Sequence, residues 1–158
     1  MNLSPPGIHP HCKNEQTLYT GSDKTCRTVM ETPHLFEDFR AGEDLGSHVQ
    51  TCDLATAERW RELFGRGPGP AEAAGVAVAM MMRSYLAVVA PRPPGNVHAR
   101  QRMTLQALPR PGESIHSSVR CVGKEVRRER RYVEIEVRAI GDDQRPLYRG
   151  TLTMIWAA

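Results

Sequence analysis

The sequence has only four cysteines, and none of them is placed as part of a metal site or a redox motif. No two of them form a C-x-x-C pair, and no histidine stands at zinc-finger spacing from them. A disulfide framework requires an oxidising compartment, and the first residues lack the basic and apolar regions of a secretory signal. We therefore expect a cytoplasmic protein with reduced thiols, no structural metal and no cofactor.

The sequence also lacks a strong excess of charge of one sign. The formal net charge is +3, with 40% hydrophobic and 25% charged residues, which is the composition of a soluble globular protein. This mild positive charge suits an anionic small ligand. It is far from the dense basic stripe of a dedicated nucleic-acid-binding protein, so we expect no nucleic-acid partner.

No apolar run in the chain has the character of a membrane span. The longest run, residues 73–90, is interrupted by Arg83 and bounded by prolines, and it is rich in alanine and methionine. This composition favours a buried helix over a membrane-spanning one. We therefore expect no membrane partner.

Residues 1–29 contain several prolines and almost no apolar periodicity. Such a segment cannot bury enough apolar surface to offset its ordering entropy, so we predict a loosely ordered tail followed by one domain over residues 30–158. His9, His11 and Cys12 form a potential metal set, but the tail interpretation is favoured. Met30 is an alternative translation start, because the organised pattern begins directly after it.

Two helices are predicted in the first half of the domain. A short strand over residues 47–52 precedes Asp53, which is placed to cap a helix over residues 55–64. The apolar side of this helix consists of Trp60, Leu63 and Phe64. After a Gly/Pro-rich loop over residues 65–70, Pro70 begins a helix that continues to Ala90. This second helix is apolar on nearly every side, which indicates that it is buried.

The hydrophobic period changes from helical to strand-like after Gly95. Residues 97–107, 115–121, 133–137 and 148–156 each alternate between apolar and polar side chains. A turn over residues 141–143 is typical of a hairpin. Because each strand has one apolar face, we predict an α+β domain in which an antiparallel sheet of five to six strands wraps a central apolar helix.

Three phrases of the sequence resemble those of MaoC-like acyl-CoA dehydratases. They are the aromatic-Glu-Asp-Phe opening at residues 35–43, the Pro-x-x-Gly-Glu turn at residues 108–115 and the start of the last strand at residues 145–151. The resemblance covers residues 35–157 and implies a single hotdog domain. It also implies a site for a 2-enoyl thioester of CoA or acyl carrier protein, in which an Asp/His pair activates water.

The sequence departs from this family at the catalytic phrase, Asp-x-Asn-Pro-x-His. No Asp, Asn or His occurs between Leu54 and Gly95, where the phrase is expected, and the loop over residues 65–70 stands in its place. General acid–base catalysis requires a titratable side chain near the reacting water. The catalytic pair of the family therefore cannot be assigned to any position of this chain.

Other residues remain as candidates near the start of the long helix. Glu72 is the only carboxylate there, and it could act as a base if burial raised its pKa. The favoured interpretation is that Glu72 only complements the helix dipole. Gly75 and Val76 are predicted to offer backbone N–H groups to a thioester carbonyl oxygen, although close packing explains Gly75 equally well.

A second group of candidates lies on the predicted strands. His98 is the histidine nearest the junction of helix and sheet, but we place it on the strand face of Arg100 and Arg102, away from the helix. Arg127 and Arg128 belong to the densest basic cluster, which could bind the phosphates of CoA or an acidic carrier protein. A solvated hairpin is the favoured alternative for this cluster.

We therefore predict a dimeric acyl-thioester-binding protein, the non-catalytic subunit of a heteromeric hydratase or dehydratase. Its partner would be a second hotdog chain, although a homodimer is also open. One alternative is a thioesterase that uses Glu72. Another is a regulatory module that binds a ligand without turnover.

Overall fold

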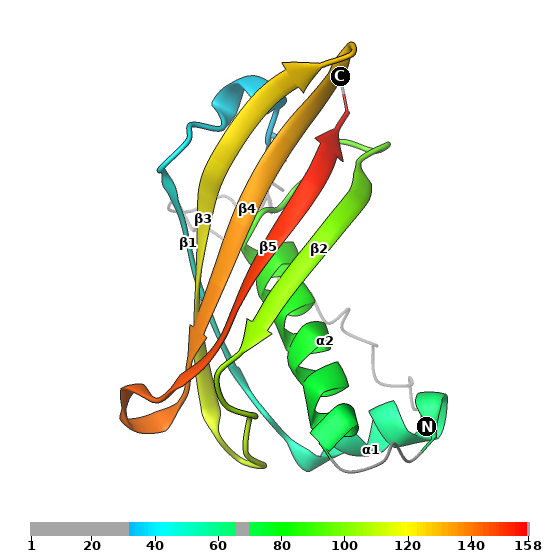
Figure 1. The fold of residues 1–158 in the computed structure, drawn as a ribbon, viewed down its shortest axis with the longest axis vertical. Helices are drawn as coiled ribbons and strands as arrows, with labels where there is room; N and C mark the ends of the chain where they lie inside the picture. The colour runs from blue at the N-terminus through cyan, green and yellow to red at the C-terminus, as the bar shows by residue number, and fades with distance from the viewer. Residues whose placement is uncertain (1–31, 66–69, 158) are drawn as a thin grey trace, which may run out of the picture. The chain divides into compact units, whose positions relative to one another are not determined.

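The part of the chain that the structure describes forms two α-helices and five strands in the predicted order (Figure 1). The computed structural model describes residues 32–65 and 70–157, and the compact unit spans Pro33–Ala158. The predicted tail, its potential metal set and Met30 lie outside the described residues and stay predictions. The elements are the 3-10 turn η1 (Phe36–Asp38), β1 (Asp44–Thr51), α1 (Leu54–Phe64), α2 (Pro70–Val88), β2 (Val97–Leu105), β3 (Ser114–Arg127), β4 (Arg130–Ile140), the 3-10 turn η2 (Asp142–Gln144) and β5 (Pro146–Trp156).

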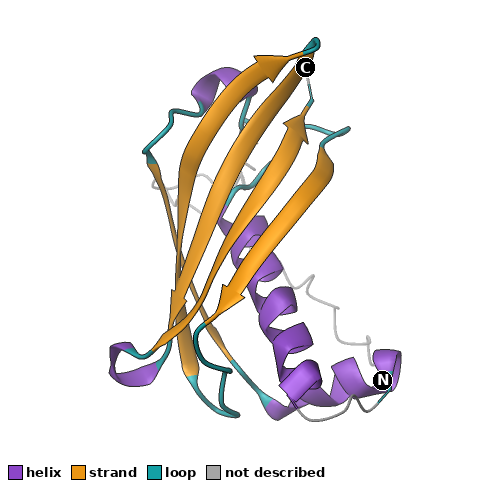
Figure 2. Cartoon of the chain, viewed as in Figure 1, coloured by secondary structure: helices purple, strands orange, loops and turns teal. Residues whose placement is uncertain are grey.

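The strands form one antiparallel sheet in the order β1-β3-β4-β5-β2. Strands β1 and β2 are its edges, and α2 lies across one face (Figure 1; Figure 2). The predicted α+β layout is therefore confirmed, with five strands. We call the face that contacts α2 the inner face and the opposite one the outer face.

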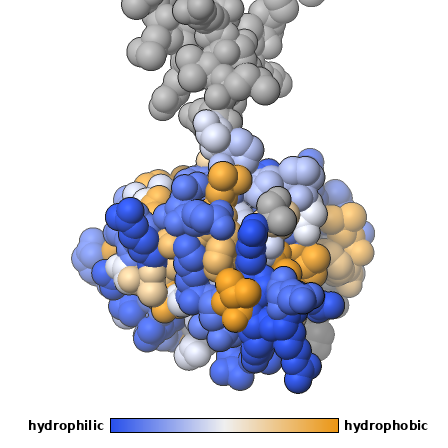
Figure 3. Space-filling model, turned by 90° about the horizontal axis from the view of Figure 1, so that it is seen from above, coloured by the Kyte–Doolittle hydropathy of each residue, from blue (hydrophilic) through white to orange (hydrophobic). Residues whose placement is uncertain are grey.

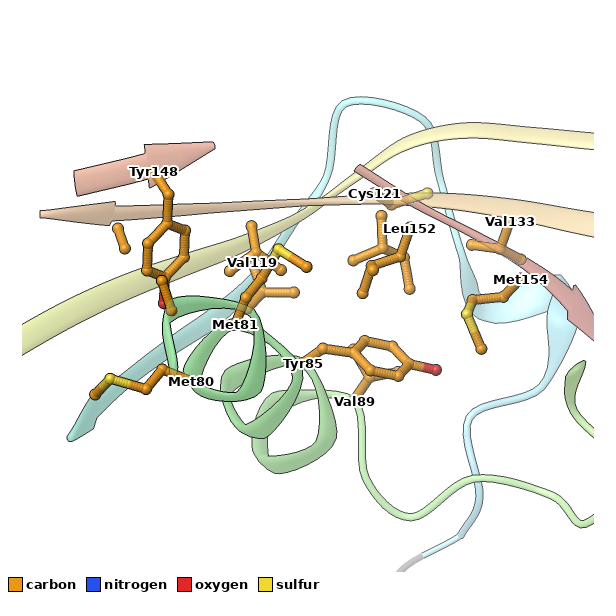
Figure 4. Packing of buried hydrophobic residues seen from close by; sticks show 14 of the residues in the cluster. Met80, Met81, Tyr85, Val89, Val119, Cys121, Val133, Tyr148, Leu152 and Met154 are labelled. Atoms are coloured by element: carbon orange, nitrogen blue, oxygen red, sulfur yellow. The ribbon is translucent and has the colours of Figure 1, made fainter. Parts of the chain in front are cut away.

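The alternation of side chains in β3, β4 and β5 explains why α2 packs on only one face. The predicted apolar positions on these strands are fully buried, among them Ile115, Val119, Val133, Ile135 and Leu152. They belong to one buried cluster with Met81 and Tyr85 of the helix, part of which is drawn in Figure 4. Because this apolar surface is removed from water, its burial is the main term that holds helix and sheet together.

A close approach of α2 to β5 depends on Gly150. A Cβ atom at this position would lie 2.0 Å from Sδ of Met81. Only a residue without a side chain therefore leaves room for Met81 above the middle of the sheet.

Helix α2 is long and apolar enough to cross a membrane, judged by length and composition alone. In the structure, however, Val76, Ala77, Met80 and Met81 are buried against the sheet. Core packing thus accounts for the apolar residues on the side of the helix that faces the sheet, whereas Leu86 is 44% exposed, so the predicted burial on nearly every side is only partly confirmed.

Strand β2 departs from its predicted alternation because of a β-bulge between His98 and Arg100. His98 is opposite Met154, whose side chain is on the inner face, whereas Arg100 is opposite Thr153 on the outer face. Directly opposed residues point to the same side of a sheet. The prediction that His98 shares a face with Arg100 and Arg102 is therefore wrong, because the extra residue in the bulge reverses the alternation.

The apolar side of α1 is only partly covered. Trp60 is half-buried against α2, and its ring centroid lies 4.3 Å from that of Phe64. Leu63 and Phe64 are 70% and 67% exposed. The amphipathic pattern predicted the helix, but its last turn has no apolar neighbour among the described residues that would bury these two side chains.

Candidate functional site

Glu72 lies in the first turn of α2 and faces α1 instead of the sheet. Its Oε1 atom is 2.6 Å from Nε of Arg61, and its side chain is 16% exposed. This ion pair keeps the carboxylate engaged with a cation. The geometry supports a structural role, in which Glu72 joins the two helices, and the proposed role as a base remains untested.

Gly75 packs directly beneath the ring of Trp60. A Cβ atom at residue 75 would lie 2.2 Å from Cζ2 of Trp60, so the glycine is required for the contact between α1 and α2. Gly75 and Val76 also lie beyond the first turn of α2, where backbone N–H groups bond within the helix. Close packing thus accounts for Gly75, and a thioester-binding role for Gly75 and Val76 stays a prediction.

Arg127 and Arg128 lie at the tip of the β3–β4 hairpin and are exposed. Arg127 is 3.8 Å from the carboxylate of Glu125, and its guanidinium carbon is 4.9 Å from the ring centre of Tyr132. Arg128 has a φ of 50°, as the tight hairpin turn requires. Figure 3 looks onto this end of the molecule, where hydrophilic surface predominates around separate apolar patches.

The predicted site residues form two groups at opposite ends of the sheet. The start of α2, with Glu72, Gly75 and Val76, lies at the end near α1 (Figure 1). The start of β2 and the β3–β4 hairpin lie at the other end, so His98 and Arg127 are far from the helix start. One chain therefore does not bring the two groups together.

A polar cluster on the inner face was missed by the sequence analysis. His48 of β1 is opposite Ser117 of β3, and Ser84 of α2 packs over them. Nδ1 of His48 lies 3.3 Å from Oγ of Ser84. Gln50 donates from Nε2 to Oγ of Ser84 at 2.9 Å and to the carbonyl oxygen of Met80 at 2.8 Å. We call the side chains of His48, Gln50, Ser84, Ser117 and Tyr148 the inner polar cluster.

Tyr148 brings a phenol into this cluster from β5, and its oxygen points toward α2 in Figure 4. Burial raises the pKa of Tyr148, while the nearby hydroxyls of Ser117 and Ser84 partly lower it. Neither serine hydroxyl forms a hydrogen bond of ordinary geometry with the phenol. Oη of Tyr148 and Oγ of Ser117 have no hydrogen-bond partner within the described residues. Oε1 of Gln50 also has no hydrogen-bond partner within the described residues.

Unpartnered buried polar atoms are uncommon and require an explanation such as a water molecule or a ligand group. The inner polar cluster offers a phenol, two hydroxyls, an amide and an imidazole. One feature of the sequence indicates this cluster: Ser84 and Ser117 occupy positions where the pattern of neighbouring residues predicts core side chains. Among the described residues, no set of three His, Cys, Asp or Glu side chains is placed to bind a metal ion.

No known family model matches the sequence, and no curated protein matches it by sequence. The structure, in contrast, is similar to several solved proteins. One is the MaoC-like dehydratase from Rhodospirillum rubrum, with a TM-score of 0.65 and 15% identity over 79% of this chain and 98% of that one. Another is the (R)-hydratase from A. caviae involved in PHA biosynthesis, with a TM-score of 0.58 and 11% identity over 77% and 99% of the two chains.

A mutant of the fluoroacetyl-CoA-specific thioesterase is also similar. Its TM-score is 0.56 and its identity is 22%, over 74% of this chain and 87% of that one. Identities of this size establish a shared fold and leave the activity open. The chain therefore has the hotdog fold that its sequence phrases predicted, a fold shared with MaoC-like dehydratases, (R)-hydratases and a thioesterase.

Proposed function

We propose that the chain is an acyl-thioester-binding hotdog protein that does not hydrate enoyl thioesters by itself. One observation carries this proposal: the fold of known hydratases occurs in a chain with no Asp, Asn or His between Leu54 and Gly95. The surroundings of Glu72 and Gly75 agree with it. Glu72 forms an ion pair with Arg61, and the ring of Trp60 covers Gly75.

Strand β2 supports the further proposal that the protein acts as a dimer. It is an edge strand with no strand paired to its free side among the described residues, and it exposes Val97 (52%) and Leu105 (39%). Two copies of β2 that pair antiparallel about a two-fold axis would place the start of one strand beside the end of the other. This arrangement would bring the end that carries His98 toward the helix start of the second subunit.

The partner is either a second copy or a different hotdog chain. A partner with an Asp/His pair would supply the proton-transfer groups, and this chain would complete the acyl pocket. A regulatory module without turnover would bind the same thioester as the non-catalytic subunit, and the two forms would differ only in the partner chain. Binding and turnover must therefore be measured separately.

The decisive experiment uses the purified full chain with crotonyl-CoA and with butyryl-CoA. We expect both thioesters to raise the melting temperature in a saturable way. We also expect no hydration of crotonyl-CoA at an enzymatic rate and no release of CoA from butyryl-CoA. Enzymatic hydration by the chain alone would overturn the proposal, and so would the absence of any saturable binding.

Affinity purification followed by mass spectrometry then distinguishes the forms of the proposal. Recovery of a second hotdog chain with an Asp-x-Asn-Pro-x-His phrase, together with hydration by the complex, supports the heteromeric subunit. Recovery of a homodimer that binds but does not turn over thioesters supports the regulatory module.

A further inference from the structure

The outer face of the sheet carries a hollow of about 350 Å³ over β5 and its neighbours. Its floor contains Thr151 and Thr153 of β5, and arginine and glutamate side chains form its walls. The register explains the shape, because Arg102 lies opposite Thr151 and Arg100 lies opposite Thr153. The short threonine side chains of β5 thus lie beside the long arginine side chains of β2, and a depression forms above the threonines.

A buried carboxylate organises one wall of this hollow. Glu136 of β4 is 4% exposed, although it is on the outer face. Its Oε1 atom accepts a hydrogen bond from Nε of Arg138 at 2.5 Å, and its Oε2 atom accepts one from Nε of Arg149. Arg138 and Arg149 are directly opposite each other on β4 and β5, so the carboxylate holds together two like charges that would otherwise repel.

This arrangement leaves the ends of both guanidinium groups available. Glu136 engages only the Nε atoms, and the terminal nitrogens of Arg138 and Arg149 have no acceptor within the described part of the chain. Their side chains remain 57% and 58% exposed. The guanidinium groups are therefore oriented in advance, which reduces the ordering entropy that an incoming ligand must offset.

Positive charge exceeds negative charge around the hollow. Arg100 and Arg102 line it from β2, and neither has an ion-pair partner in the residues that the structure describes. Glu134 is the second carboxylate, and its Oε1 atom accepts a long hydrogen bond of 3.5 Å from Oγ1 of Thr153. Three guanidinium groups, those of Arg100, Arg102 and Arg149, thus line the hollow with two carboxylates. One of these carboxylates, Glu136, is already shared by Arg149 and Arg138.

From this geometry we propose that the outer-face hollow is a binding site for a small phosphate-bearing anion with two or more negative charges. Guanidinium groups bind phosphate oxygens in pairs through their planar fork, and the threonine hydroxyls add donors at the floor. The volume lies at the lower end of the range of small-ligand pockets. No aromatic side chain lines the hollow, so stacking of a nucleic-acid base has no support there.

The site is separate from the proposed thioester function, because it lies on the face opposite α2. The same phosphate chemistry has two sources, which are the diphosphate and phosphate groups of CoA and a free anion such as pyrophosphate. Binding of either is consistent with the arginine geometry. The comparison of the two probes therefore identifies the source.

The test titrates the full chain with inorganic pyrophosphate and with CoA by isothermal calorimetry at constant ionic strength. We expect saturable binding that becomes about tenfold weaker or more in Arg102→Gln and in Arg100→Gln, since each loses charged hydrogen bonds. Arg59→Gln is the matched control, because Arg59 is exposed and lies on α1, which is not part of the sheet. Its affinity for both anions should equal that of the wild type.

Circular dichroism checks that each variant is folded, and amide chemical shifts of β2 and β5 provide a second readout in the wild type. Much tighter binding of CoA than of pyrophosphate assigns the site to CoA, and similar affinities assign it to a free anion. The proposal is overturned if binding is not saturable, or if Arg102→Gln and Arg59→Gln bind both probes equally. Thioester binding measured with butyryl-pantetheine, which has no nucleotide phosphates, reports on the proposed function independently.

Discussion

Glu113 and Arg145 form a buried ion pair that joins two loops at one end of the sheet. Nη2 of Arg145 lies 2.6 Å from Oε2 and 2.7 Å from Oε1 of Glu113, and the same nitrogen donates to the carbonyl oxygen of Leu108 at 3.1 Å. A Cβ atom at Gly141 would lie 2.0 Å from Oε1, so a glycine is needed beside the pair. Two of the phrases that resemble MaoC-like dehydratases, residues 108–115 and 145–151, are thus physically connected through this pair.

The first prediction concerns the acid dependence of stability. Burial opposes ionisation of Glu113, but the bonds from Arg145 and from the backbone N–H of Arg110 outweigh it and lower its pKa. A carboxyl whose folded pKa lies below the unfolded value of about 4.3 stabilises the fold above that pH. This contribution is lost as the pH falls through the folded pKa.

Glu113→Gln should therefore lower the free energy of unfolding at pH 7 by about 3 kcal/mol, because it leaves the half-buried guanidinium of Arg145 (23% exposed) without its counter-charge. Its stability should also fall less steeply than that of the wild type below about pH 5. Urea unfolding at a series of pH values measures both effects. Glu58→Gln, at an exposed position on α1, is the control. Equal slopes for Glu113→Gln and the wild type would contradict the prediction.

The second prediction tests the contact between Trp60 and Gly75. Gly75→Ala should destabilise the protein by about 1–3 kcal/mol, because the new methyl group overlaps the indole ring. In a Trp60→Ala background the same change should stabilise it by about 0.5–1 kcal/mol, since alanine is the better helix former. Thermal unfolding of the four proteins gives the coupling energy. Independent, additive effects would show that the two residues do not touch.

The third prediction concerns the unpartnered phenol in the inner polar cluster. Tyr148→Phe should leave the free energy of unfolding unchanged or raise it by up to about 1 kcal/mol, because Oη has no hydrogen-bond partner to lose. Leu152→Ala, on the same face of β5, should cost about 2–5 kcal/mol. Denaturant unfolding compares the two. A loss of about 2 kcal/mol in Tyr148→Phe would mean that water satisfies the phenol in solution.

The fourth prediction tests β2 as the subunit interface. A lysine on an edge strand prevents pairing with another edge, so Leu105→Lys should convert a dimer to a monomer without loss of the fold. Light scattering after gel filtration measures the mass. Val49→Lys, on the exposed side of the other edge strand β1, is the matched control and should remain dimeric. If Val49→Lys alone dissociates the dimer, β1 is the interface instead.

The fifth prediction addresses Glu72. Glu72→Gln should leave the rate of CoA release from butyryl-CoA at the wild-type level. It should reduce the free energy of unfolding by less than about 1 kcal/mol, because the partner Arg61 is 42% exposed and its charge is screened by solvent. A thiol-reactive dye measures CoA release. A fall in hydrolysis with unchanged stability would return Glu72 to a catalytic role.

Hydrophobic period predicted most of the fold. The alternation at residues 115–121 and 133–137 predicted two strands whose apolar side chains are indeed buried, and the apolar helix predicted after Pro70 is α2, which is buried on the side that faces the sheet. These elements could be predicted because period and burial are local consequences of residue order. The bulge after His98 could not be predicted, because one extra residue reverses a face without any change in composition.

The candidate site was less predictable than the fold. The absence of Asp, Asn and His from Leu54 to Gly95 is a property of the sequence alone, and it carries the proposal that the chain does not hydrate by itself. The inner polar cluster combines His48, Ser84 and Tyr148 from three elements that are far apart in the chain. No local pattern reports such a meeting, because side chains become neighbours only when strands and helix pack.

By itself, the sequence predicted an α+β hotdog fold with a central apolar helix, and it lacks an Asp-x-Asn-Pro-x-His phrase between Leu54 and Gly95. The tertiary structure alone decided that Glu72 engages Arg61, that Gly75 makes room for Trp60, and that arginines from β2 and β5 share one hollow with glutamates from β4. The physical reason is the same in each case. Period and composition act along the chain, whereas ion pairs, close contacts and charge clusters depend on sheet register and helix packing, which join residues that are distant in sequence.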